Sequence, residues 1–171
     1  MRVRAERRTE AAVTTTNLAE LLTREHRDID GGIERFVAGL DRGATDREPL
    51  LSAFAALRRH IYLEETFLFP PLREGGMVMP VLVMLREHGA LWRLMDSLSA
   101  LLAADASVAE LEPGCRELLA ELDRHNGKEE PIIYPRADAD LGERAVAELA
   151  EFLRTGSTPD GWRCAALDPQ P

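Results

Sequence analysis

The sequence predicts an all-α fold, an antiparallel up-down-up-down four-helix bundle with a short fifth C-terminal helix. Two observations support this prediction. Apolar residues recur every three or four positions, which is the spacing of one buried helix face, and no long stretch alternates with the period of two typical of strands. The periodic segments are roughly 20 residues long, and short loops join them, so consecutive helices are expected to pack antiparallel.

The first predicted helix covers 17–40. Asn17 opens it and Glu20 follows three residues later, which is the arrangement of an N-terminal capping box. The segment before it has no apolar periodicity. The predicted layout is a flexible N-terminal arm at 1–16, a helical bundle at 17–154 and an irregular C-terminal tail at 155–171.

The remaining predicted helices are 46–69, 80–104, a fourth that begins between 107 and 113 and ends near 131, and a shorter fifth at about 138–154. Prolines define several of these ends, because proline lacks the backbone N–H and is tolerated best in the first turn of a helix. Pro70 and Pro71 should stop the second helix, which we expect to be straight up to Phe69. Pro80 should open the third helix, and Pro131 should kink or end the fourth.

Charge and composition argue against several classes of partner. The net charge of −9 disfavours nucleic acid, whose phosphates need a basic surface. No run approaches the ~20 apolar residues of a membrane span, and the basic start lacks the apolar region of a secretory signal. Cys115 and Cys164 allow at most one disulfide and match no metal-ligand spacing. We therefore expect a cytoplasmic protein without nucleic-acid or membrane partners, whose oligomeric state stays open.

All four histidines of the chain fall on predicted buried faces, one on each long helix. Two glutamates, Glu64 and Glu129, lie on the same faces, each one turn after a histidine, and these two faces end with Phe67 and Ile132. A lone histidine on an apolar face is usually an ordinary core residue. Four out of four on such faces, together with two buried glutamates, favour a metal site instead.

The glutamates themselves require a cation. An ionised carboxylate on a buried face costs several kcal/mol unless it is neutralised. Residues four apart on a helix have Cβ atoms roughly 5–6 Å apart, so an imidazole and a carboxylate can converge on one ion. Imidazole with carboxylate suits first-row metals such as iron, manganese or zinc. Without a cysteine in the set, a structural thiolate zinc site is excluded.

The chain also repeats itself. Segments 60–70 and 125–135 align without gaps and share the pattern His-x3-Glu-Glu-x4-Pro, and a Glu-His dipeptide precedes each of them, at 25–26 and 87–88. Each half is therefore a helical hairpin that offers two histidines and one glutamate. Two such hairpins related by a pseudo-two-fold axis would form a central dinuclear site.

Several neighbours of these residues have competing interpretations. Glu65 and Glu130 are expected to be solvated neighbours of the site, with a contact to a ligand as the less favoured alternative. Tyr62 and Tyr134 are interpreted as packing residues, although either could donate a hydrogen bond near the site. Asp30, one turn after His26, could orient an imidazole or lie on the helix surface.

This pattern resembles the hemerythrin-like (HHE cation-binding) family over residues 17–136. The resemblance implies a non-haem di-iron centre, two iron ions with an oxo or hydroxo bridge, inside a four-helix bundle. By position, the terminal ligands would be His26, His60, His88 and His125, and the bridging ligands Glu64 and Glu129.

The sequence departs from the oxygen-carrying hemerythrins that it resembles. They have a further histidine one turn after the third-helix histidine, where this chain has Trp92, and an aspartate where it has Glu130. The ligand set is instead similar to proteins for the repair of iron centres, which act on nitrosative and oxidative damage. Those proteins carry a cysteine-bearing N-terminal segment, and residues 1–16 contain no cysteine. We expect no reversible oxygen carriage, and Trp92 should form a wall of the pocket.

Two function classes fit these observations. The first is a di-iron redox protein that reacts with nitric oxide, oxygen or peroxide in protection against nitrosative and oxidative stress, with an unknown electron donor. Each iron would have one open position for such a small ligand. The second is a non-catalytic sensor or binding module, in which metal occupancy or redox state changes a partner contact. Whether the chain is an enzyme, and whether manganese or zinc replaces iron, stays open.

Overall fold

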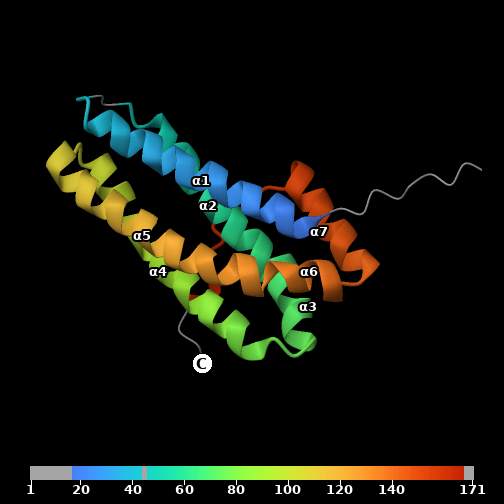
Figure 1. Ribbon diagram of the computed structural model, residues 1–171. Coiled ribbons are helices and arrows are strands. Elements are labelled where there is room, and N and C mark those ends of the chain that lie inside the picture. Colours follow the sequence, from blue (N-terminus) through green and yellow to red (C-terminus); the bar gives the residue numbers. More distant parts are fainter. Residues whose placement is uncertain (1–16, 44–45, 168–171) are drawn as a thin grey trace, which may run out of the picture.

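The computed structural model describes residues 17–43 and 46–167, so the predicted arm at 1–16 lies outside the described residues. Four long helices lie side by side as an antiparallel bundle, which confirms the predicted all-α fold (Figure 1). Helix α1 packs against α2 and α5, and α4 packs against α5. The long helices are α1 (Leu18–Leu40), α2 (Glu48–Leu63), α4 (Val78–Ala103) and α5 (Val108–Ile132).

Shorter elements extend the bundle at the end where α1 begins and where α2 and α5 end. Figure 1 shows α3 (Phe69–Glu74), α6 (Tyr134–Asp140) and α7 (Glu143–Thr155) gathered there. Two further short elements are the π-helix η1 (Glu64–Leu68), which joins α2 to α3, and the 3-10 turn η2 (Ala165–Leu167), which packs on α4.

The interior consists of two hydrophobic clusters. One includes Ile33, Phe54 and Leu118 and fills the bundle on the side of the α1–α2 turn. The other includes Leu22 and Tyr134 and fills the end closed by α3, α6 and α7. The buried histidines and glutamates come from positions between the two clusters along each helix, so the polar layer is enclosed by apolar side chains on both sides.

Side-chain caps fix the starts of two long helices. Asn17 Oδ1 accepts a hydrogen bond from the backbone N–H of Glu20 at 2.9 Å, as its position predicts. Ser107 and Glu110 form a complete capping box at the start of α5. Asp138 of α6 adds a tertiary contact, because its carboxylate accepts the otherwise unpaired backbone N–H of Leu18 at 2.8 Å. This contact ties α6 to the start of α1.

The second predicted helix differs from the observed one. Pro70 and Pro71 do not stop it, because they lie in the first turn of α3, where their missing N–H groups are tolerated. The chain reaches this turn through η1, in which the N–H of Phe69 donates to the carbonyl of Glu64, five residues back. A π turn is wider than an α turn, and it leaves room for the Pro70 ring, which would otherwise press on the carbonyl of Thr66.

The C-terminal third also differs from the prediction. Helix α5 ends at Ile132, directly after Pro131, as expected. The single predicted helix at 138–154 is wrong, because α6 starts earlier, at Tyr134, and the extended backbone of Leu141 separates it from α7.

The tail is not irregular throughout. It contains the 3-10 turn η2, and Cys164 is fully buried. The tail packs closely on α4, since a Cβ atom at Gly89 would lie 2.8 Å from the Cβ of Ala166. The predicted tail residues 168–171 lie outside the described residues.

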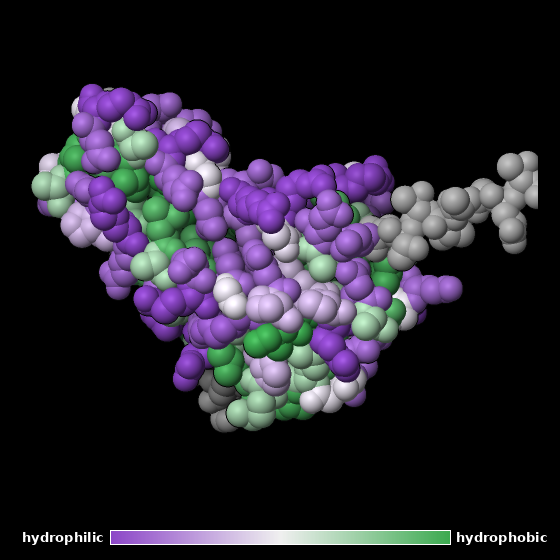
Figure 2. Space-filling model, in the orientation of Figure 1, coloured by the Kyte–Doolittle hydropathy of each residue, from purple (hydrophilic) through white to green (hydrophobic). Residues whose placement is uncertain are grey.

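The surface in view is mostly hydrophilic, and apolar side chains gather at its lower edge, where α4 begins (Figure 2). Exposed Val78, Met79 and Leu82 belong to this end of α4. Among the described residues, no helix combines the length and the apolar character needed to span a bilayer.

Candidate metal centre

Four histidines and two glutamates form a buried polar layer across the middle of the bundle. They arrange into two groups of four whose potential ligand atoms all lie within 4.8 Å of one another. The first group is His26, His60, Glu64 and Glu129, and the second is Glu64, His88, His125 and Glu129. The structure therefore brings together all six residues that the sequence singled out.

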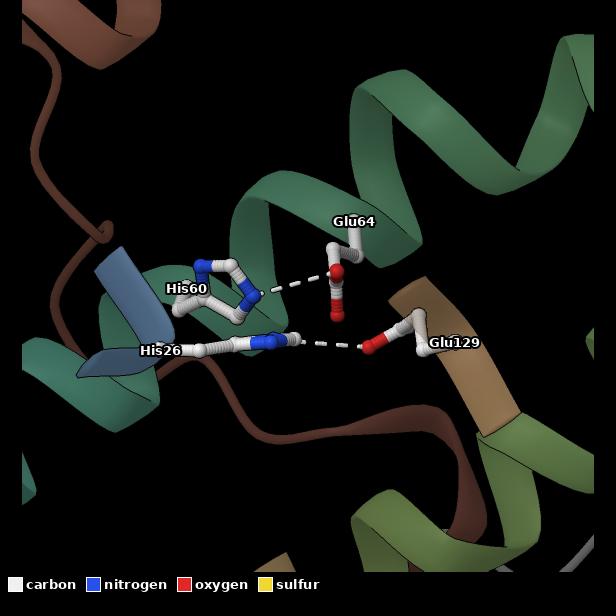
Figure 3. A group of neighbouring side chains, drawn as sticks. All are labelled: His26, His60, Glu64 and Glu129. Carbon is white, nitrogen blue, oxygen red and sulfur yellow. Dashed lines mark ion pairs between the residues drawn. The ribbon is translucent and has the colours of Figure 1, made fainter. Parts of the chain in front are cut away.

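Each helical hairpin supplies the histidines of one group. His26 and His60, from α1 and α2, lie edge to face with ring centroids 4.7 Å apart, and Figure 3 shows both facing Glu64 and Glu129. His88 and His125, from α4 and α5, have ring centroids 5.1 Å apart. Spacing of four residues on one helix turns His60 towards Glu64 and His125 towards Glu129.

The two glutamates lie between the groups. Glu64 Oε1 is 3.1 Å from Nε2 of His60, while Glu64 Oε2 is 3.2 Å from Nε2 of His88. Glu129 Oε2 is 3.1 Å from Nε2 of His125 and 3.5 Å from Nε2 of His26. Each carboxylate thus reaches histidines of both hairpins, which is the arrangement that two bridged metal ions would need.

A second set of glutamates holds the outer nitrogens of the four rings. Nδ1 of every histidine lies within hydrogen-bond distance of one carboxylate. The pairs are His60 with Glu25 (2.8 Å), His88 with Glu65 (2.9 Å), His26 with Glu130 (3.0 Å) and His125 with Glu87 (3.1 Å). A carboxylate accepts and cannot donate, so Nδ1 carries the hydrogen, and Nε2 is left to face the cluster.

Two of these outer carboxylates correct the sequence-based interpretation. Glu65 and Glu130 were expected to be solvated, but Glu65 has only 6% of its side chain exposed, and both contact an imidazole. Glu25 and Glu87 have a role at the site that was not predicted from the sequence. The signal that could have identified them is the Glu-His dipeptide repeated in the two halves.

Basic residues hold two of the outer glutamates in turn. Arg59 donates to Glu25 Oε1 at 2.7 Å and also to the carbonyls of Phe152 and Gly156 at the end of α7. Lys128 pairs with Glu87. Neither Arg59 nor Lys128 was singled out from the sequence. Helical periodicity shows which face of its own helix a basic residue occupies, but not which neighbouring helix its side chain contacts.

The histidine pKa values follow from these contacts. Burial lowers the pKa of His125, but the carboxylates of Glu129 and Glu87 outweigh it and raise it to about 10. Burial likewise opposes the rise at His60, whose pKa the Glu64 and Glu25 carboxylates hold well above its usual value. The hydrogen bond from His125 holds the pKa of Glu87 down, at about 2. Without a metal, protons on His60 and His125 therefore help to balance the buried carboxylates.

Tyr134 is a further residue at the cluster. Its hydroxyl donates to Glu64 Oε1 at 2.8 Å and lies 2.7 Å from Nε2 of His26. Burial and the charges of Glu129 and Glu64 raise its pKa well above the usual value. The sequence-based interpretation of Tyr134 as a packing residue is therefore incomplete, and its alternative, a hydrogen bond near the site, is confirmed.

The chemistry of the cluster fits a cation. Among the described residues, three buried atoms of the second group have no hydrogen-bond partner: Glu64 Oε2, His88 Nε2 and Glu129 Oε1. Buried polar atoms are normally paired. Glu64 Oε2 and His88 Nε2 lie 3.2 Å apart without a hydrogen bond between them, so a cation bound by both would satisfy both atoms. Imidazole nitrogen and carboxylate oxygen together are the donor set of iron, manganese or zinc.

Other candidates from the sequence lie elsewhere. Asp30 accepts from the side-chain amide of Asn126 at 3.3 Å rather than from an imidazole. Tyr62 packs edge-on against Trp162. Trp92 is buried in the larger hydrophobic cluster, where Trp162 and the guanidinium of Arg58 flank its ring.

The two cysteines take no part in the cluster. Cys115 and Cys164 are buried and unpaired. Burial raises the pKa of each thiol to about 11. Both therefore remain protonated at neutral pH, and a protonated thiol is a poor nucleophile.

Comparison with known proteins gives one family. No curated protein and no solved structure matches the chain significantly. The family model described as the hemerythrin HHE cation binding domain matches residues 17–137, which include all six residues of the cluster. With its bundle and its two His/Glu groups, this chain belongs to the hemerythrin HHE cation-binding family.

Proposed function

We propose that the chain is a non-haem di-iron protein that reacts with nitric oxide, oxygen or peroxide and protects against nitrosative and oxidative stress. One observation carries the proposal: two groups of four buried ligands share Glu64 and Glu129, so they can hold two metal ions side by side. Within the family, the four-His, two-Glu set favours the iron-centre repair type over the oxygen carriers. The unpaired cysteines support a cytoplasmic setting.

Of the redox-active metals that suit this donor set, we propose iron. The set combines imidazole with carboxylate and contains no thiolate, which leaves iron, manganese and zinc as candidates, and zinc has no redox chemistry. Two iron ions joined by an oxo or hydroxo bridge would supply one-electron steps and open positions for a small ligand. An oxidoreductase activity would also need an electron donor.

The protein residues orient the ligands and limit access. The outer glutamates fix each imidazole through Nδ1, which turns Nε2 towards the metal positions and raises its basicity. The cluster side chains are almost completely buried, so only a small molecule can reach them without a rearrangement.

A surface cavity of about 460 Å³ lies beside the second group, separated from it by two residues of its lining. Its lining includes Glu65 and Phe69, which both contact His88: Glu65 by its hydrogen bond, and Phe69 by stacking with ring centroids 5.4 Å apart. We infer that a diatomic molecule or peroxide enters from this cavity. A turn of the Phe69 ring would open it towards the cluster.

A sensor or binding module is the alternative, and one contact favours it. The backbone N–H of Ala165, in the C-terminal tail, donates to Glu65 Oε2 at 2.8 Å, while Glu65 Oε1 holds His88. A change of charge at the metal centre would alter the hydrogen bond from His88 to Glu65. Because the same carboxylate accepts from Ala165, the contact between the tail and the bundle would change as well. In that case the tail would be the output element.

Metal analysis of aerobically purified protein, with optical spectra before and after addition of nitric oxide, tests the proposal. We expect two irons per chain and an oxo-bridge absorption that nitric oxide alters. His60→Ala should lose about half the iron, since the first group loses a ligand and Glu64 loses its counter-charge. Full iron retention in His60→Ala would contradict the assignment. An unchanged spectrum, with a partner that binds only one metal state, would favour the sensor.

A further inference from the structure

The hydroxyl of Tyr134 lies in the middle of the first group. Its oxygen is 2.7 Å from Nε2 of His26 and 2.8 Å from Glu64 Oε1, and it is also 3.1 Å from Nε2 of His60 and 3.3 Å from Glu129 Oε2. One oxygen atom therefore touches a potential ligand atom of every residue in the group. Among the described residues, the second group has no such atom, and His88 Nε2 and the Glu64 oxygen beside it, Oε2, have no hydrogen-bond partner.

The two halves of the pseudo-two-fold repeat differ chemically at this position, because only one of them carries a hydroxyl group. In the gapless alignment of 60–70 with 125–135, Tyr134 corresponds to Phe69. Both rings lie against a histidine of their group: Phe69 against His88, with centroids 5.4 Å apart, and Tyr134 against His26, with centroids 5.3 Å apart. Matching rings occupy matching places, and only one of them carries an oxygen.

The ring cannot move far from this place. Tyr134 is fully buried in the hydrophobic cluster at the closed end of the bundle. It begins α6, which Asp138 ties to the backbone N–H groups at the start of α1. A metal bond to nitrogen or oxygen is about 2.0–2.2 Å long. An ion that bonds His26 and Glu64 on the side of the phenol would therefore come within bonding range of the phenol oxygen, which lies within 3 Å of both ligand atoms.

We propose that Tyr134 is a fifth protein ligand of the metal in the first group, and that the two metal positions are therefore inequivalent. This inference rests on the proposed metal centre. On binding of a ferric ion, the phenol O–H bond breaks, an iron–oxygen bond forms and the proton leaves to solvent, with no change of oxidation state. The first position then has five protein donors and the second has four, so an exogenous ligand binds at the second position, beside His88 and Phe69.

The spectrum of the ferric protein tests the ligand directly. A phenolate bound to iron(III) gives a charge-transfer band in the visible, and the chain contains only two tyrosines. The full chain, loaded with iron and oxidised, should show this band together with two irons per chain. Tyr134→Phe should lose the band. Tyr62→Phe is the matched control and should keep it, since Tyr62 packs against Trp162, away from the cluster.

An exchange between the two halves strengthens the test. Tyr134→Phe combined with Phe69→Tyr moves the hydroxyl to the matching place beside His88, and the band should return. Resonance Raman spectra of the wild-type protein grown with ring-deuterated tyrosine give an answer that needs no variant: phenolate ring modes should be enhanced in the band and should shift with the label.

The outcomes separate this inference from the proposed function. Two irons per chain without a phenolate band in the wild type, or a band that persists in Tyr134→Phe, overturns the role of Tyr134 and leaves the di-iron proposal intact. Fewer than two irons per chain in the wild type counts against the dinuclear centre itself, and the role of Tyr134 falls with it.

Discussion

Each imidazole of the cluster lies between two carboxylates. Nε2 faces one of the two central glutamates, and Nδ1 is within hydrogen-bond distance of an outer one, so the ring cannot flip without breaking the hydrogen bond at Nδ1. Two outer glutamates, Glu65 and Glu130, hold histidines of the opposite hairpin, and the other two hold histidines of their own. The orientation of every ligand therefore depends on how neighbouring helices pack.

Glu65→Gln should weaken metal binding at the second position. The amide keeps the shape of the side chain but removes the negative charge that raises the basicity of His88, and such outer contacts are worth roughly 10–100-fold in metal affinity. Competition with a chelator would measure the loss. Glu117→Gln, at an exposed position on α5, is the matched control. Equal affinities of the two variants would contradict the role given to Glu65.

The residues that the sequence identified and those that it missed differ in a physical way. His26, His60, Glu64 and their counterparts lie on the apolar stripe of their own helix, so helical periodicity alone places them inside. Glu65 lies one position further round the helix, where its surroundings depend on the rotation of the next helix. The periodicity of one segment shows that such a residue lies outside the apolar face of its own helix. It does not show whether a neighbouring helix contacts the residue at that position.

Among the helical elements, η1 has the most direct effect on the site. Its extra residue shifts the buried face by one position, so Leu68 and Phe69 are buried, whereas the regular period predicted Phe67. The same shift occurs in the other half at the junction of α5 and α6, where Ile133 is buried and Ile132 is half exposed. Pro70 and Pro135, which match in the repeat, come directly after the two shifted segments. The irregularity is therefore a consequence of the repeated sequence. It brings Phe69 and Tyr134 to the cluster.

The tail offers a test at the level of elements. Gly89→Ala should destabilise the protein by about 1–3 kcal/mol, the usual cost of overpacking, because the new Cβ would lie 2.8 Å from the Cβ of Ala166. The strain should lift η2 from α4 and expose the tail to proteases. Denaturant unfolding and limited proteolysis measure the two effects.

Gly127→Ala is the matched control for that substitution, with an expected effect of opposite sign. Gly127 is exposed on α5, and a Cβ atom at this position would meet no atom within 4 Å, so alanine should stabilise the helix by up to about 1 kcal/mol. A destabilised Gly127→Ala would show that α5 is constrained near Pro131 in a way that the open space does not reveal.

For the whole molecule, the buried charges link stability to pH and to metal. In the metal-free protein the pKa of His125 is raised to about 10, and that of His60 is also raised. A raised pKa means that the folded chain holds a proton that the unfolded chain releases above about pH 6.5. The stability due to these histidines is therefore fully present below about pH 6.5 and is lost as the pH rises towards 10.

The metal-free protein should accordingly become less stable between pH 7 and pH 10, by up to about 1.4 kcal/mol per pH unit for each such histidine. Metal affinity should rise over the same range, because the metal displaces these protons. Urea unfolding of the metal-free protein, and calorimetry of metal binding in buffers of different ionisation enthalpy, measure the two trends. Stability of the metal-free form that stays constant over this range would argue against protonated imidazoles.

The sequence was sufficient to predict the bundle and its polar layer, because four amphipathic segments and a repeated His-x3-Glu pattern determine both. It was insufficient for the tail. Nothing in the periodicity of α4 indicates that Gly89 leaves room for Ala166, or that Ala165 reaches Glu65. Contacts of this kind join residues far apart in the chain and leave no local pattern.

The exposed turn at Gly75 and Gly76 separates the two hairpins, and cutting the chain there would give two peptides, each with half of the ligands. Neither half would be self-sufficient, because Glu64 and Glu129 serve both groups and the outer glutamates cross between hairpins at His26 and His88. By mass action, a metal that binds only the joined pair drives the halves together. The protein would then behave as a two-piece switch whose reassembly, followed by light scattering, reports the concentration of free metal.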